Sequence, residues 1–191
     1  ISGNLNISNT GSSQVEMSAG SLTVGGELNI DGMFVISGAT SRSLTVNDVV
    51  LIGGSGNLNL CNGGAANIGT LNVLSHITNF GAITESGTGK GVINFMGAAN
   101  QNFNEFGAFV NNIDVNIDNA AGVTVTNTTS VSGILTLTNG ILTIPVNQTV
   151  TIANGTAIGG TGFGAAKHIA TAVNYGTGEK GFLRINNMAA S

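Results

Sequence analysis

Residues 132–156 have the sequence SGILTLTNGILTIPVNQTVTIANGT, in which three short alternations of apolar and polar residues follow one another. The alternations are ILTLT, ILTI and TVTI, and the linkers NG and PVNQ separate them. Alternation with a period of two predicts a half-buried strand, and Gly, Asn and Pro between the runs predict tight turns. The stretch therefore predicts three short strands in succession.

The same kind of run recurs along most of the chain, whereas no window shows the apolar spacing of an amphipathic helix over three turns. Each run has three to five residues and is bounded by Gly, Asn, Asp or Ser. The further runs lie at 4–8, 14–18, 21–25, 27–31, 43–47, 57–61, 70–74, 91–95, 115–117 and 122–126. We therefore expect an all-β protein of many short strands.

A longer period connects these runs. One series of apolar residues recurs at nearly constant spacing: Leu5, Leu28, Val49, Leu71, Val92, Ile113 and Leu135. A second series recurs at almost the same spacing: Val15, Ile36, Leu58, Phe80, Phe103, Val123 and Ile144. A third series, beginning at Leu22 and Leu44, is less regular. The common period is about 22 residues, a length typical of the repeats of solenoid proteins.

A rung of about 22 residues that holds two or three strands predicts a parallel β-solenoid. Alternate residues of each strand would point inward and form a continuous aliphatic column. The outward residues would form hydrogen-bonded polar ladders from rung to rung: Asn6, Asn29, Asn59, Asn72, Thr23, Thr45 and Thr136. The alternative is an antiparallel β-sandwich or barrel, which also has many short strands but no fixed register of this kind.

Composition excludes several classes of function. Charged residues are 7% of the chain, against about 25% in typical globular proteins, and the net charge is −4. Nucleic acids and anionic membranes are bound by basic surfaces, so we expect neither as a partner. No apolar run reaches the roughly 18 residues of a membrane-spanning helix, and we expect no membrane insertion. No signal peptide is visible, so we expect a processed chain or a piece of a larger one.

The C-terminal region differs from the rest in its charge. We divide the chain into a solenoid array at 1–159 and a cap or docking segment at 160–191, where two strands flank the Gly-rich turn GTGEKG. Because the end strands of a solenoid have unpaired edges, such an end needs a cap or a partner. The candidate docking residues are Lys167, His168, Tyr175, Lys180 and Arg184. The alternative is an irregular continuation of the array.

Two segments, GVINFMGAANQNF at 91–103 and FVNNIDVNIDNAAGVTVTNTTSVSGILTLTNGILTI at 109–144, carry a resemblance to known proteins. They resemble the low-complexity extracellular β-repeat regions of large secreted and surface proteins of the Bacteroidota. The resemblance covers roughly residues 85–160 and implies a secreted or surface-attached β-helical array, often part of an adhesin. Its motifs are architectural, so it implies no catalytic residue and no cofactor.

Candidates for chemistry are few among the nine carboxylates. Glu27 and Asp48 are separated by about one repeat and could stack on neighbouring rungs, where a cation such as Ca²⁺ could bind; the alternative is two solvated turn carboxylates. His76 and His168 have no partner at ligand spacing. Cys61 is alone and is expected to be a buried apolar residue. We predict no cofactor and no metal.

The phenylalanines at 95, 103, 106 and 109 form a second candidate group. We expect them to fill the core of a wider rung. The alternative is an exposed aromatic strip that stacks on sugar rings.

These features favour a non-enzymatic structural protein, at the cell surface or outside the cell: a subunit of a fibre, a sheath or an adhesin stalk. Rods of this kind could associate head to tail into a homopolymer through the solenoid ends. A carbohydrate-binding or carbohydrate-cleaving β-helix is the alternative, with surface glycans as partners. An ice-binding solenoid is less favoured, because the Thr pairs at 124/126, 136/138 and 149/151 would lie on different faces.

Overall fold

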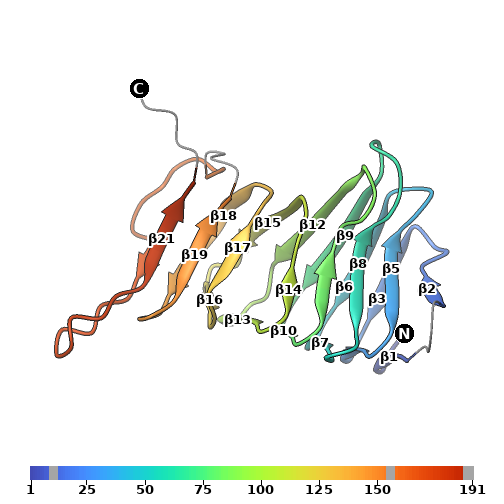
Figure 1. The fold of residues 1–191 in the computed structure, drawn as a ribbon, viewed down its shortest axis with the longest axis horizontal. Coiled ribbons are helices and arrows are strands. Elements are labelled where there is room, and N and C mark those ends of the chain that lie inside the picture. The colour runs from blue at the N-terminus through green and yellow to red at the C-terminus, as the bar shows by residue number, and fades with distance from the viewer. Residues whose placement is uncertain (9–12, 154–157, 187–191) are drawn as a thin grey trace.

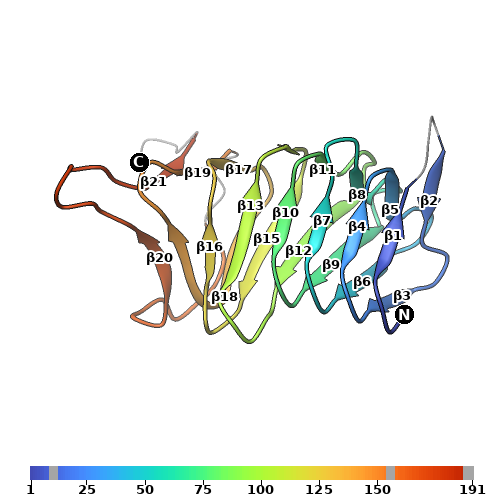
Figure 2. The same cartoon turned by 90° about the horizontal axis from the view of Figure 1, so that it is seen from below.

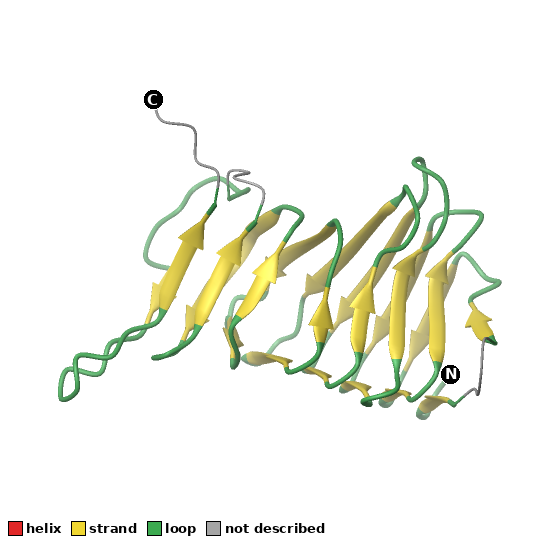
Figure 3. Ribbon diagram, viewed as in Figure 1, coloured by secondary structure: helices red, strands yellow, loops and turns green. Residues whose placement is uncertain are grey.

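A computed structural model describes residues 1–8, 13–153 and 158–186 of the chain. These residues contain strands and loops but no helix (Figure 3). They form a rod in which the chain winds through about seven turns of a parallel β-solenoid, with rungs of about 22 residues (Figures 1 and 2). The predicted fold class is therefore confirmed, and the sandwich alternative is wrong.

Each rung contributes strands to three faces of the rod. Face 1, seen in Figure 2, holds the strand that opens each rung. Its strands are β1 (Leu5–Ile7), β4 (Leu28–Ile30), β7 (Val50–Ile52), β10 (Ile77–Asn79), β13 (Gln101–Glu105), β16 (Val123–Val125), the second half of β18 (Leu135–Ile144) and β20 (Lys167–Thr171).

Face 2 lies toward the viewer in Figure 1 and consists of two sheets in line. The first sheet contains β2 (Gln14–Glu16), β5 (Met33–Ser37), β8 (Asn57–Cys61), β11 (Ala82–Thr84) and β14 (Ala108–Phe109). The second sheet contains β17 (Thr129–Val131), β19 (Thr149–Ile152) and β21 (Phe182–Ile185).

Face 3 closes each rung. It contains β3 (Ser21–Val24), β6 (Arg42–Val46), β9 (Ile68–Val73), β12 (Lys90–Phe95), β15 (Ile113–Asp118) and the first half of β18. The long strand β18 bends around the corner from face 3 to face 1 at Gly140, where φ is 86°. A Cβ at Gly140 would also collide with the carbonyl of Asn119, so both backbone conformation and space favour glycine at this corner.

Strands pair in parallel with the strand one rung later, except that β14 and β17 on face 2 are not paired with each other. The register keeps apolar side chains in columns. On face 3 the column runs through Leu22, Leu44, Leu71, Ile93 and Val115. The spacing along the sequence is constant within this column, except for a longer step from Leu44 to Leu71. The less regular series beginning at Leu22 and Leu44 is therefore a true column of the structure.

The two more regular sequence series are wrong in detail because they cross from one face to another. Leu28 pairs with Val50 on face 1, whereas Leu71, the later member of the first series, lies on face 3. In the second series Phe80 lies in an exposed turn, and Ile83 is the residue that pairs with Leu58. The rungs differ in length, so residues at a constant spacing shift from one face to another along the chain. Because Leu, Val and Ile are abundant, an apolar residue is still found at each step.

The core is a column of aliphatic side chains along the rod axis, with Phe34 and Phe95 among its largest members. Burial of apolar surface stabilises a protein by about 25 cal/mol per Å². No single rung could bury its apolar side chains by itself, because each rung is covered by the next.

Polar ladders cover the outside, as predicted. On face 3 the Nδ2 of Asn94 donates to the Oδ1 of Asn72 (2.8 Å), and Asn72 donates to Thr45 (3.2 Å). On face 1, Asn29 donates to Asn6 (2.9 Å). Such bonds satisfy the amides and add contacts between rungs.

Two members of the predicted ladders behave differently. Asn59 is buried, and its Nδ2 donates to Ser86 Oγ at 2.6 Å. On face 3 the hydroxyl of Thr138, rather than that of Thr136, donates to Asn116 (2.7 Å), because the register shifts between Ile117 and Asp118. The Thr pairs considered for ice binding do lie on different faces, as expected.

The C-terminal region forms the two strands predicted around a Gly-rich turn. β20 pairs in parallel with β18, and β21 pairs in parallel with β19. The proposed boundary at 159/160 falls in a connection, where Gly159 makes a single bridge to Thr136. Residues 160–186 thus continue the array irregularly and also form its last rung; residues 187–191 of the proposed segment lie outside the described residues.

We predict that Gly69→Ala destabilises the rod, because a Cβ at this position would collide with the backbone carbonyl of Leu60. The expected loss is roughly 1–3 kcal/mol in the free energy of unfolding. Gly54→Ala is the matched control, because nothing lies within 4 Å of its added Cβ; it should change stability by less than about 1 kcal/mol. Urea denaturation followed by circular dichroism measures both. Equal stabilities would contradict the packing described here.

Candidate functional site: the two ends of the rod

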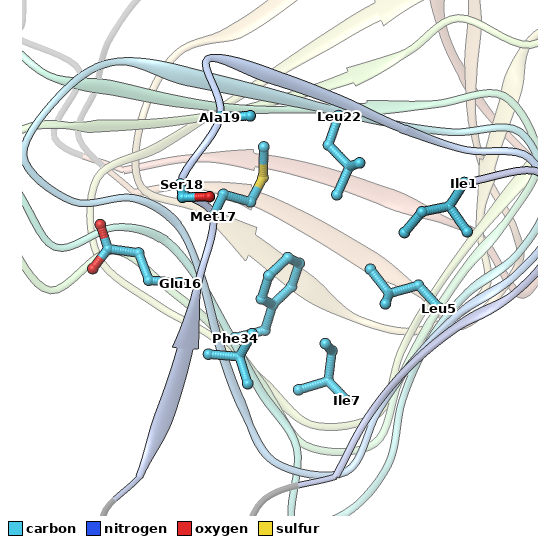
Figure 4. A pocket seen from close by; sticks show the side chains of 10 residues that line it. Ile1, Leu5, Ile7, Glu16, Met17, Ser18, Ala19, Leu22 and Phe34 are labelled. Atoms are coloured by element: carbon cyan, nitrogen blue, oxygen red, sulfur yellow. The ribbon is translucent and has the colours of Figure 1, made fainter.

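The N-terminal end of the rod leaves the core open. A hollow of about 260 Å³ lies there, and Ile1, Leu5 and Phe34 are among the side chains that line it. Figure 4 shows these apolar side chains around a common space, while the carboxylate of Glu16 points away from it. Ile1 is 56% exposed and Val15 is 41% exposed. This end therefore presents apolar surface that every internal rung buries.

The C-terminal end is open in the same way. A hollow of about 320 Å³ is lined by Ile158, Phe163, His168, Ile169 and Leu183. Phe163, which lines this hollow, is 53% exposed. The two ends of the described rod are thus both apolar.

The end strands have a pairing partner on one side only within the described residues. β2 is the first strand of its sheet on face 2 and pairs with β5, whereas β21 is the last strand and pairs with β19. The other edge of each strand presents backbone N–H and C=O groups that can pair with a further strand.

The five predicted docking residues all lie at the C-terminal end, but on three elements. Lys167 and His168 are neighbours on β20. Lys167 Nζ donates to Thr138 O (3.4 Å) and lies 5.9 Å from the centre of the Phe163 ring. His168 Nδ1 lies 3.0 Å from Gly164 O. These two side chains therefore contact their own chain.

Tyr175 and Lys180 belong to the C-terminal arm, which we define as residues 172–181. The arm joins β20 to β21 and projects beyond the end of the rod (Figures 1 and 2). An antiparallel bridge between Val173 and Lys180 holds its two sides together. Tyr175 is 94% exposed, the highest value among the large apolar side chains described.

The base of the arm is fixed to the preceding turn. Asn147 Nδ2 donates to Glu179 Oε1 (2.9 Å), and Asn147 N donates to Lys180 O (2.9 Å). The bonds from Asn147 and Thr177 hold the pKa of the Glu179 carboxyl below its usual value, because they stabilise the charged form. Arg184, the fifth residue, is exposed on β21 and pairs in register with Thr151.

The two ends carry opposite charge. The chain before Arg42 contains Glu16, Glu27 and Asp31 but no Lys or Arg. The C-terminal end instead has Lys167, Lys180 and Arg184 against one carboxylate side chain. Sequence inspection noted the basic cluster but missed its acidic counterpart, because the three carboxylates were considered one at a time and not as a group before Arg42.

The register does not place Glu27 and Asp48 directly opposite each other, as the hypothetical cation site assumed. Leu28 pairs with Val50, so the residue opposite Glu27 is Val49. Asn4 and Asn29 donate to Glu27 Oε2 (3.3 and 3.4 Å), and Asp48 accepts from the N–H of Val49. Across the described ranges no three His, Cys, Asp or Glu side chains lie close enough to hold a metal ion.

The other residues considered for chemistry have structural partners. His76 Nδ1 accepts from Asn102 N (3.0 Å), and Cys61 is buried, as expected. Phe95 and Phe103 lie in the core, and Phe109 packs against it. Phe106 is instead exposed and stacks on Phe80, with 5.1 Å between ring centres. Of the four residues of the alternative aromatic strip, only Phe106 is exposed in a ring stack, and its partner is Phe80.

Sequence inspection missed the polar residues that line the inside of two corners. Asn79 Nδ2 donates to Glu105 Oε1 (2.8 Å) one rung later, and the N–H of Gly81 donates to Asn79 Oδ1 (3.0 Å). Gln101 and Asn119 form a similar buried pair at another corner (2.9 Å). The signal was present, since Asn79-Phe80-Gly81 and Glu105-Phe106-Gly107 repeat one turn motif.

Comparisons of this chain with protein-family models, curated proteins and solved structures find no match. In the parts of the chain that the structure describes there is also no helix that could cross a membrane.

Glu105 should make stability depend on pH. Burial raises the pKa of its carboxyl to about 7, against hydrogen bonds from Asn79 and Gly107 that lower it. The native state therefore retains a proton that the unfolded chain loses above pH about 4.5, so stability should fall as pH rises from about 4.5 to 7. Burial also raises the pKa of Glu85, which adds in the same direction.

We predict that Glu105→Gln removes most of the fall in stability between pH about 4.5 and 7. The amide stays neutral at every pH, and its Oε1 can accept the same two hydrogen bonds. The gain in the free energy of unfolding should be about 1–3 kcal/mol at pH 8 and close to zero at pH 4. Urea denaturation at both pH values measures it. A gain of the same size at pH 4 would show that ionisation of Glu105 is not the cause.

Proposed function

We propose that this protein is a structural rod of the cell surface or the extracellular space, a module of a fibre, sheath or adhesin stalk, and that copies associate end to end. The observation that carries the proposal is the pair of open ends. One apolar core runs the length of the described rod and reaches the hollow at each end, where Leu5 and Ile169 are only partly buried.

The sides of the rod support the same function. They are covered by ladders of Asn and Thr that donate to one another from rung to rung, such as Asn94 to Asn72. These amides and hydroxyls are engaged along the rod, where Phe80 and Phe106 are the most exposed apolar pair, whereas unpaired strand edges and hollows that reach the core lie at its described ends. Because the two ends are different surfaces, association through them is head to tail, and because they lie at opposite ends of the rod axis, it gives an open filament.

The location outside the cell rests on the sequence. Residues 91–103 and 109–144 resemble extracellular β-repeat regions of secreted and surface proteins. Parallel β-solenoids serve many functions, so the fold does not distinguish this location from others.

End-to-end association predicts that a charge placed on an end prevents assembly and that a charge placed on a side does not. Val15→Asp puts a carboxylate in the N-terminal hollow, whereas Leu51→Asp puts one on the side, on β7. The wild-type residues have similar exposures, 41% and 37%. Because burying an unpaired carboxylate is costly, V15D should remain monomeric while L51D assembles like the wild type.

Sedimentation velocity over a concentration series, with negative-stain electron microscopy, measures this assembly. Circular dichroism of both variants verifies that they are folded. The wild type should form filaments of uniform width and of growing length. Monodisperse short rods at every wild-type concentration would overturn end-to-end association. If V15D and L51D both lose assembly to the same extent, assembly does not depend on the ends in particular.

A further inference from the structure

We propose that a second copy of this chain docks with its β2 against β21 in parallel, with Leu183 opposite Val15 and Arg184 opposite Glu16. This joint rests on the end-to-end association proposed above and specifies its register. Face 2 would then continue from one copy into the next as one sheet.

The alternation of side chains restricts the register. On β21, Leu183 pairs with the buried Val150 and faces the core, so its neighbour Arg184 faces outward. On β2, Val15 pairs with the buried Phe34, so Glu16 faces outward. A continuous core therefore requires an inward residue of β21 to lie opposite an inward residue of β2.

Backbone polarity is compatible with this pairing. Met17 N donates forward to Val35 O (3.0 Å), so the inward residues of β2 bond to the next rung. The backbone N–H and C=O groups of Gln14 and Glu16 then point to the free edge of β2, because these groups alternate in direction along a strand. On β21, Phe182 N donates to Gln148 O of the preceding rung (2.9 Å). The backbone N–H and C=O groups of Leu183 therefore point to the free edge of β21. Leu183 can thus bond to residues 14 and 16 of the second copy.

Charge favours this register over one shifted by two residues. With Leu183 opposite Val15, the guanidinium of Arg184 lies beside the carboxylate of Glu16, on strands about 4.8 Å apart. Both side chains are exposed, and the only ion pair among the described residues joins Lys90 to Asp114. A shift of two residues would place Arg184 opposite an uncharged residue, Gln14 or Ser18. The acidic N-terminal end and the basic C-terminal end also attract each other in this orientation alone.

The C-terminal arm leaves room for the second copy. β20 ends at Thr171 on face 1 and β21 begins at Phe182 on face 2, so the arm leaves the rod at the corner between these faces. It projects past the end of the rod (Figures 1 and 2). None of its residues lines the hollow at that end. The arm would therefore flank a docked copy.

Charge reversal tests the pair directly. Glu16→Arg places two arginines opposite each other, and Arg184→Glu places two glutamates there. Each single variant should raise the concentration at which half of the protein has assembled by about tenfold, because like charges in register repel. The double variant restores an opposite pair at the wild-type net charge and should return within about threefold of the wild type. Asp48→Arg, with the same charge change as E16R, should have no effect.

Cysteine cross-linking tests the register independently of assembly strength. In a Cys61→Ser background, E16C with R184C should form intermolecular disulfides under mild oxidation, because Cα atoms of directly opposed residues lie within disulfide range. Q14C with R184C should cross-link much less, since residue 14 lies about 6.6 Å further along the strand.

The outcomes separate the two proposals. A wild type that never assembles contradicts the proposed function itself. A wild type that assembles, with single and double variants indistinguishable from it and with Q14C cross-linking as well as E16C, contradicts the register and leaves end-to-end association in place. Weaker assembly of the single variants, recovery of assembly in the double variant and selective cross-linking at residue 16 support the proposed pairing of β2 with β21.

Discussion

Parallel pairing between strands of successive rungs is the constraint on which the rest of this structure depends. It places residues whose side chains point to the same side of the sheet opposite each other. Leu22, Leu44 and Leu71 therefore stack in the core, and Asn72 donates to Thr45 on the outside. It also leaves every rung incomplete without its neighbours, because its inter-strand hydrogen bonds and most of its apolar contacts belong to adjacent rungs. The open ends of the rod follow from the same rule.

The fold could be predicted from the sequence because strand alternation and turn residues are local signals. The register could not, because it depends on connection lengths that no local signal reveals. Between faces 1 and 2 the connection is short after Asn79 and much longer after Thr171, yet both rungs keep their columns. A search for a constant period therefore selected Leu71 as a successor of Leu28, although the two residues lie on different faces.

The docking role of the five named residues stays a prediction, whereas their place in the fold can be compared with the sequence. A cluster of basic residues indicated the C-terminal end, and the structure places all five of the named residues there. The complementary acids Glu16, Glu27 and Asp31 were not recognised as a group, although they lie close together in the sequence. The buried pair of Asn79 and Glu105 was missed for another reason: polar residues were assigned to the outside, whereas those at corners satisfy backbone groups from within.

The orientation of the strands has a mechanical consequence. β1 and β21 lie at opposite ends of the rod, and the hydrogen bonds between rungs run along its axis (Figures 1 and 2). Tension between the ends pulls along these bonds and loads the outermost row first, so rungs peel away singly instead of shearing together. A released rung of about 22 residues extends to roughly 70 Å, about fifteen times the roughly 4.8 Å that it occupied. Stretched in this way, the rod is a tether that lengthens in steps.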